Sequence, residues 1–399
     1  MPAAEAPSLI GPLTASTSGD IGSTVDRRSP IGAVSFVCSV HATRGNRGLI
    51  RSVAVSSTNQ RIAWPDAARG LAIILVVLHH GIIYAAVEGL VAPFWVAMTE
   101  FLRTMLMPLF FMAAGLFAVK WVTGPWRSLF RSKVLLFAWV FVLWVVMRWI
   151  VLNLIAGADS ETGILQLPLH MVWPIGGWFI FVLAIFFVVA RLMKNVPLIA
   201  QLLGAGAVSA VWFSIDAGNI VGNNAWDGIP LFYFFFVVGC YGRSSILHLV
   251  DTLRVCQGAA VLALWATAYF LLKSFGLVGA PGLSFVLRCL GLMAGVVIAK
   301  ALADVVVLRH LGQRTLPIYM SHSLWFALVV WISTLLVHPS PTAGWLVPLA
   351  VGILGLAAGY ASGWLAPRLR LQWLFATPSW VRRVFDRAWP QRTRSGGIS

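Results

Sequence analysis

The sequence alternates between long apolar stretches and short polar breaks from about residue 67 to residue 366. A membrane helix needs about 20 mainly apolar residues to cross the hydrocarbon core of a bilayer. The pattern therefore predicts one all-α domain, residues 61–366, built as a polytopic membrane bundle of about ten transmembrane helices. The predicted spans lie near residues 67–87, 95–119, 133–156, 175–192, 196–215, 227–242, 255–274, 282–303, 313–336 and 344–366.

Charged residues in the breaks predict the orientation of these spans. The break after the second span carries Lys120, Arg127, Arg131 and Lys133, whereas the break before it holds Glu88 and no lysine or arginine. The later breaks alternate in the same way, with Lys273 on the outer side as the one exception, and the tail after residue 366 is rich in arginine. Because lysine and arginine accumulate on the cytoplasmic side, we expect a multi-pass inner-membrane protein with both termini in the cytoplasm.

Composition agrees with a lipid environment, since 59% of the 399 residues are hydrophobic and only 11% are charged. The formal net charge of +16 raises the question of a nucleic-acid partner. The basic residues, however, lie in the tails and in alternate short breaks, which is a topology signal, so we expect no nucleic-acid partner. The four cysteines lack the paired spacing of a zinc site, and we expect no bound metal.

The two ends of the chain differ in composition from the membrane domain. Residues 1–60 are rich in Ser, Gly, Thr and Arg, and their longest apolar run, Ile31 to Val40, is too short to span a bilayer. We expect a disordered basic cytoplasmic tail there, without a signal peptide, and a second basic cytoplasmic tail over residues 367–399.

Ionisable residues within the predicted spans are candidate site residues, because a charge at the bilayer centre is costly and usually faces a protein interior or a water-filled cavity. The candidates are His79, His80, Glu100, Arg103, Arg148, Arg288 and His322.

Two of these histidines are predicted to meet. Arg69 and His80 are eleven residues apart, about three helical turns, so they share a helix face with roughly 16 Å between them along the axis. His322 reaches a similar depth from the same side, about nine residues into its span. Histidine suits proton transfer near neutral pH, although a membrane histidine can also simply bond a neighbouring helix. His79 lies about 100° around the helix from His80 and is the weaker candidate.

The remaining charges allow two interpretations each. Glu100 and Arg103 are three residues apart and could neutralise each other within one helix. Arg148 and Arg288 could extend to the membrane interface, or could bind an anionic or hydroxylated substrate. The basic cluster of Arg127, Arg131 and Lys133 could anchor the topology or bind the phosphates of a ligand.

The stretch from Trp64 to His80 resembles the first span of the integral-membrane acyltransferase type 3 family, which carries a basic residue, ten intervening positions and a histidine, as Arg69 and His80 do. Three later segments resemble that family in order: Pro108–Gly115, Trp178–Leu183 and Leu311–His322. The resemblance covers about residues 61–366. One departure is that Arg127 and Arg131 are separated by three residues, whereas the family usually has two there.

The resemblance implies an enzyme that moves an acyl group, with acetyl expected, from cytoplasmic acyl-coenzyme A to a hydroxyl of a cell-envelope carbohydrate or glycolipid. In that interpretation His80 is the catalytic base or forms an acyl-histidine, and His322 assists it. Arg69, Arg127, Arg131 and Lys133 would hold the phosphates of the donor. Substrate contacts would come from Glu100, Arg103, Arg148, Arg288 and Tyr319.

Two other hypotheses remain open at this stage. A transporter of a lipid, sugar or proton could use the same buried His, Glu and Arg side chains as a relay. A non-enzymatic subunit of a glycan assembly complex would need none of them for chemistry. Nothing in the short outer breaks identifies the acceptor.

Overall fold

The computed structural model describes residues 62–156, 166–174, 176–215, 219–336 and 340–390, and within these ranges the chain is helical and contains no β-strand. This confirms the all-α fold. A long helix lies on each predicted apolar stretch: α1 (Trp64–Val87), α2 (Pro93–Leu116), α5 (Leu135–Ala156), α7 (Trp178–Leu192), α8 (Leu198–Ser214), α9 (Asn224–Tyr241), α11 (Val255–Ser274), α12 (Leu283–Ala301), α14 (Thr315–Leu336) and α15 (Pro341–Leu365).

Length and hydropathy mark most of these helices as membrane-spanning. Over the described ranges, seven helices are long and apolar enough to cross a bilayer. An eighth span results if α9 and the following α10 (Arg243–Thr252), which are bent by 76° at their junction, count as one. The protein is therefore a multi-pass helical membrane protein, while the count of ten spans stays a prediction.

Several short helices have no counterpart in the predicted pattern. They are α3 (Val119–Val122), α4 (Trp126–Leu129), the π-helical turn η1 (Phe130–Val134), α6 (Gln166–Val172), η2 (Met193–Asn195), α13 (Val306–Gln313), η4 (Gln372–Leu374) and α16 (Ser379–Ala388). Of these, α4 and η1 continue directly into α5. The helix of the third predicted span thus begins at Trp126, earlier than expected, and it carries the basic cluster along its first turns.

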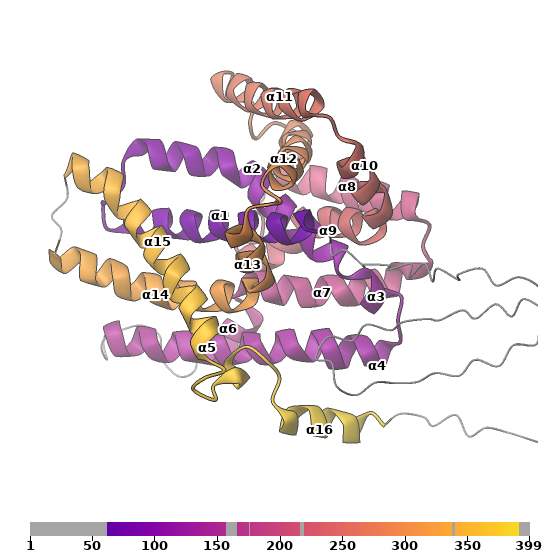
Figure 1. The fold of residues 1–399 in the computed structure, drawn as a ribbon, viewed down its shortest axis with the longest axis vertical. Coiled ribbons are helices and arrows are strands. Elements are labelled where there is room, and N and C mark those ends of the chain that lie inside the picture. The colour runs from indigo at the N-terminus through magenta and orange to yellow at the C-terminus, as the bar shows by residue number, and fades with distance from the viewer. Residues whose placement is uncertain (1–61, 157–165, 175, 216–218, 337–339, 391–399) are drawn as a thin grey trace, which may run out of the picture. The chain divides into compact units, whose positions relative to one another are not determined.

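Helix α1 lies at the centre of the bundle, where it packs against α2, α12, α13, α14 and α15 (Figure 1). Two glycines permit its closest approach to α13. A Cβ added at Gly70 would overlap the Leu308 carbonyl, and one added at Gly312 would overlap the Asp66 carbonyl. Small residues let helix backbones come into contact where lipid supplies no hydrophobic drive for association. The start of α1, which carries Arg69, is fixed against α13 in this way.

The segment after α15 folds back along α5. The indole N–H of Trp139 donates to the Trp373 carbonyl at 2.8 Å, and that of Trp144 donates to the Leu374 carbonyl at 2.8 Å. These bonds satisfy backbone carbonyls of a stretch that is mostly non-helical. Helix α16 then lies beside the first turns of the α4–η1–α5 helix (Figure 1). The predicted basic tail therefore packs on the bundle as far as residue 390, and the predicted tail over residues 1–60 lies outside the described residues.

Candidate active site

Two histidines from distant helices meet inside the bundle. His80 on α1 and His322 on α14 have ring centroids 5.0 Å apart with an interplanar angle of 68°. His79 also contacts His80, with ring centroids 5.3 Å apart. His322 is buried, with 4% of its surface exposed. The predicted meeting of His80 and His322 at one level is thus present in the structure.

Backbone carbonyls orient both imidazoles in the same sense. The Nδ1 of His80 lies 2.8 Å from the Val76 carbonyl oxygen, and the Nδ1 of His322 lies 3.2 Å from the Ile318 carbonyl oxygen. A carbonyl can only accept, so each Nδ1 carries the proton and each Nε2 keeps its lone pair. The Nε2 of His322 is buried and has no hydrogen-bond partner. The Nε2 of His322 is therefore a basic nitrogen that no described group occupies.

A cavity of about 210 Å³ lies next to the histidine pair, with Tyr319 between the two. Tyr319 lines it and also packs on His322, with ring centroids 5.6 Å apart. The backbone N–H of Phe179 donates to the Tyr319 hydroxyl oxygen at 3.1 Å, which fixes this side chain between the cavity and the histidine. The other walls are mainly apolar: Phe110, Ala114, Leu136, Phe137, Ile180, Leu183 and Phe187.

Two cations line the cavity. Arg69 and Lys133 both line it, and the Nη2 of Arg69 donates to the Thr315 hydroxyl at 2.8 Å. The Arg69 guanidinium also lies over the Phe117 ring, 5.2 Å from its centroid. A mainly apolar cavity that contains two cations and adjoins a pair of imidazoles fits a substrate with an apolar part and an anionic group.

A family model described as an acyltransferase domain matches residues 62–364. This chain belongs to the acyltransferase type 3 family. Comparison with curated proteins and with solved structures found no match. The matched range includes both histidines, the cavity and its basic rim, so the membrane domain is the acyltransferase domain.

In this acyltransferase, Arg127 and Arg131 do not line the cavity with Arg69 and Lys133. Arg127 donates from Nη2 to Asp386 on α16 at 2.5 Å and from Nε to the Trp389 carbonyl at 2.7 Å. Arg131 donates from Nε to the same carboxylate at 2.9 Å and from Nη2 at 3.0 Å. These bonds, above all those of Arg131, lower the pKa of Asp386 from its usual range. Two of the four predicted phosphate ligands therefore hold the C-terminal helix.

Arg148 approaches the histidines of the acyltransferase from α5. Its Nη1 donates to the hydroxyl of Tyr84 at 3.3 Å, and its charge acts on both His80 and His322. Gly176 leaves the space that its side chain occupies, since a Cβ there would come within 2.9 Å of the Arg148 Cδ. Arg148 is thus directed into the bundle, and its role in substrate binding stays a prediction.

The other predicted substrate residues are more dispersed. Arg103 lies near enough to act on His79, His80 and Arg288 electrostatically. Glu100 forms an ion pair with Lys273 of α11, with 2.6 Å between Oε2 and Nζ. Glu100 is therefore paired between helices and not with Arg103 on its own helix.

Arg288 is held by its own helix and by a ring on α8. Its Nη1 donates to the carbonyl of Ser284 at 3.0 Å and to the hydroxyl of the same residue at 2.5 Å, and its guanidinium lies 3.9 Å from the Phe213 ring centroid. These contacts hold the Arg288 side chain against α12 and α8, and its role in substrate binding stays a prediction.

Some residues that shape the site carry no sequence signal of their own. Thr315 holds Arg69, and Tyr84 holds Arg148, but neither is ionisable near neutral pH or exceptional in a membrane helix. Tyr84 could have been found from its place one turn after His80 on the same face of α1. Across the described residues, no group of three or more His, Cys, Asp or Glu side chains is placed to hold a metal ion.

Proposed function

We propose that this protein transfers an acyl group, acetyl in the simplest case, from cytoplasmic acyl-coenzyme A to a hydroxyl group of a cell-envelope carbohydrate or glycolipid. The observation that carries the proposal is the contact between His80 and His322, next to a cavity lined by Tyr319 and by two cations, Arg69 and Lys133. The anionic nucleotide of the donor would lie at Arg69 and Lys133, with its pantetheine arm in the apolar channel.

The proposed chemistry is direct transfer by general base catalysis. The Nε2 of His80 takes the proton of the acceptor hydroxyl while that oxygen attacks the thioester carbonyl. The C–S bond then breaks, the thiolate of coenzyme A leaves, and the imidazolium returns the proton to it. The Nδ1–H bond to Val76 holds the ring in the tautomer that this step needs. His322 orients the attacking hydroxyl or shares the proton through its own Nε2.

The order of residues along α1 suggests separate approaches for the two substrates. Arg69, His80 and Tyr84 lie on one face of this helix, with His80 between the other two. Arg69 belongs to the donor cavity, whereas Tyr84 bonds Arg148 beyond the histidines. An acceptor bound at Arg148 and Arg103 would reach His80 from the side opposite the donor.

The proposed placement in the membrane follows from the same order. In the proposed topology, ten spans cross the inner membrane and both termini lie in the cytoplasm. The start of α1, and with it Arg69, then lies on the cytoplasmic side, where acyl-coenzyme A is available. The acceptor side of the histidines then faces away from the cytoplasm, toward envelope glycans and glycolipids.

The first test is transfer or hydrolysis of radiolabelled acetyl-coenzyme A by the purified protein in nanodiscs, with His80→Ala as the variant and His79→Ala as the matched control. We expect His80→Ala to bind the donor and lose turnover by about 10²- to 10⁴-fold, with little change for His79→Ala. A wild-type protein that binds no acyl-coenzyme A would contradict the proposal and favour transport instead.

A further inference from the structure

Arg191, in the last turn of α7, is a buried charge with no counter-ion among the residues that the structure describes. Only 8% of its surface is exposed, and its Nε and Nη1 are both buried without a hydrogen-bond partner. The guanidinium group makes a cation–π contact with the Trp126 ring on α4, whose centroid lies 5.4 Å from the guanidinium carbon. Buried charges in proteins are normally paired, because an unpaired one costs several kcal/mol. An anionic ligand would therefore supply the partner that the buried Arg191 charge needs.

Two lysines stand on the neighbouring segments. Lys120 and Lys133 lie over the same Trp121 ring, with their Nζ atoms 4.7 Å and 5.4 Å from its centroid. Neither lysine is paired with a carboxylate of the described residues. Their segments, α3 and η1, both pack against α7, which carries Arg191. We call these three cations, with Trp121 and Trp126, the indole–cation cluster.

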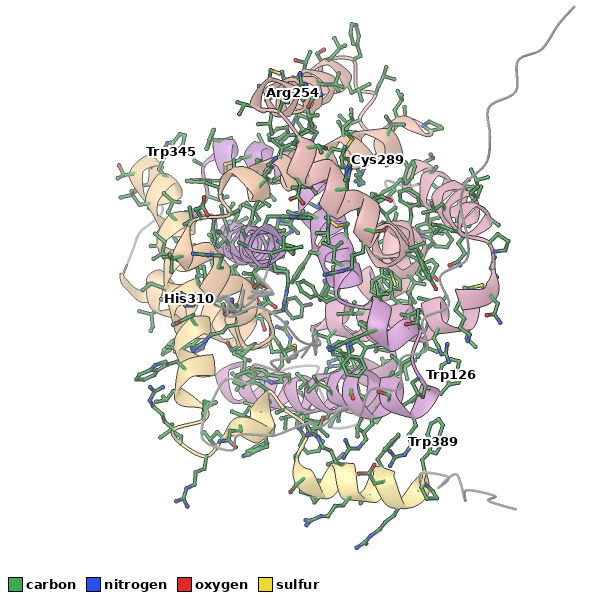
Figure 2. The ribbon with its side chains drawn as sticks, turned by 45° about the vertical axis from the view of Figure 1, so that its right-hand side comes forward. Trp126, Arg254, Cys289, His310, Trp345 and Trp389 are labelled. Carbon is green, nitrogen blue, oxygen red and sulfur yellow. The ribbon has the colours of Figure 1, made fainter. Side chains whose placement is uncertain are left out.

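The indole–cation cluster adjoins the donor cavity. Lys133 lines the cavity and lies over Phe187, 6.0 Å from its ring centroid. Phe187, a cavity wall itself, is one helical turn before Arg191 on α7. The segments that carry the cluster, α3 and η1, both pack against α7. Figure 2 places Trp126, the ring under Arg191, near Trp389 at the end of α16.

The two neighbouring arginines differ from Arg191 because they are already paired with a carboxylate. Arg127 and Arg131, which the sequence offered as phosphate ligands, already share the carboxylate of Asp386. A phosphate bound by these two guanidinium groups would compete with Asp386 for them. In contrast, no carboxylate of the described ranges is paired with the indole–cation cluster.

We propose that Arg191, Lys120 and Lys133 bind the nucleotide phosphates of the acyl donor, in place of Arg127 and Arg131. This assignment rests on the proposed function, because it takes the donor to be an acyl-coenzyme A. A phosphate group supplies several acceptor oxygens and a full negative charge, which match the free donors of a guanidinium and two ammonium groups.

The test compares two donors on the full chain in nanodiscs of neutral lipid. Acetyl-coenzyme A carries the nucleotide, whereas S-acetyl-pantetheine has the same thioester and no phosphate. We expect Arg191→Gln to weaken acetyl-coenzyme A binding about ten- to hundredfold, the loss of one charge-assisted hydrogen bond. Binding and turnover of S-acetyl-pantetheine should be unchanged in this variant, and Lys120→Gln should show the same selectivity more weakly.

Arg382→Gln, an exposed arginine of α16, is the matched control and should bind both donors as the wild type does. A variant that loses both donors equally, or neither, overturns the assignment. An effect of Arg191→Gln that appears only in discs with anionic lipid also overturns it, because the cluster would then bind lipid headgroups. Failure of the wild type to bind acetyl-coenzyme A at all would instead remove the proposed function itself.

Discussion

His322 lies against His80 with its Nε2 buried and unpaired, while its Nδ1 is tied to the carbonyl of Ile318 one turn earlier. A buried nitrogen that no protein group satisfies is costly in a purely structural histidine. The arrangement is understandable if the atom is used during turnover, when a substrate hydroxyl or a shared proton occupies it.

Replacing His322 by asparagine tests that use. The amide can still donate to the Ile318 carbonyl but has no basic nitrogen, so we expect turnover to fall by about 10²-fold or more with donor affinity kept. Single-turnover assays with bound acetyl-coenzyme A measure the chemical step. Retention of full activity in His322→Asn would assign this residue to packing alone.

Removing the hydroxyl of Tyr319 should affect stability more than chemistry. The Tyr319→Phe change leaves the buried N–H of Phe179 without its acceptor, which costs about 1–3 kcal/mol. Thermal unfolding in detergent should show a lower midpoint. The control is Tyr360→Phe, which keeps the ring that Arg314 covers and should leave the midpoint nearly unchanged. Equal midpoints for the two variants would contradict the proposed role of this hydrogen bond.

Docking of α16 should depend on pH through Asp386. Its pKa is lowered in the folded protein by the bonds to Arg131 and Arg127, so the stabilisation is complete above the usual carboxyl pKa of about 3.9. It is lost as pH falls through the lower folded value, because protonation removes the charge. Hydrogen exchange over residues 379–388 should therefore stay slow from neutral pH down to about pH 5 and quicken under stronger acid.

The Asp386→Asn variant lacks this charge at every pH. It should exchange rapidly over the same residues even at pH 7, and its exchange should lose the acid-dependent step of the wild type. Slow exchange in Asp386→Asn at neutral pH would mean that α16 is held mainly by its aromatic contacts, such as that between Phe130 and Trp389.

The contact between α2 and α9 should not tolerate a side chain at its glycines. A Cβ at Gly239 would overlap the Met112 carbonyl, and one at Gly115 would overlap the Phe236 carbonyl. We expect Gly239→Ala to lower the yield of folded protein and its thermal midpoint, because backbone would have to move. Gly204→Ala on α8, where a Cβ meets no atom within 4 Å, is the control and should be neutral or slightly stabilising. Size-exclusion profiles and unfolding midpoints distinguish the two.

Much of the fold followed from the sequence because lipid imposes a simple rule: apolar stretches of sufficient length form helices that satisfy their own backbone bonds. The positions of the ten long helices, the shared face of Arg69 and His80, and the depth of His322 all follow from helical geometry and spacing. The short helices α13 and α16 did not follow from it, since they are neither long nor uniformly apolar.

The sequence by itself thus determined the helices, the pairing of His80 with His322 and the family. Only the tertiary structure decided which charges are neutralised and which are free. In the structure, Arg127 and Arg131 form ion pairs with Asp386, and Glu100 forms one with Lys273. Arg191 is buried and has no counter-ion among the described residues. The physical reason is that apolar periodicity and spacing act within one helix, whereas an ion pair forms between helices and depends on how they pack.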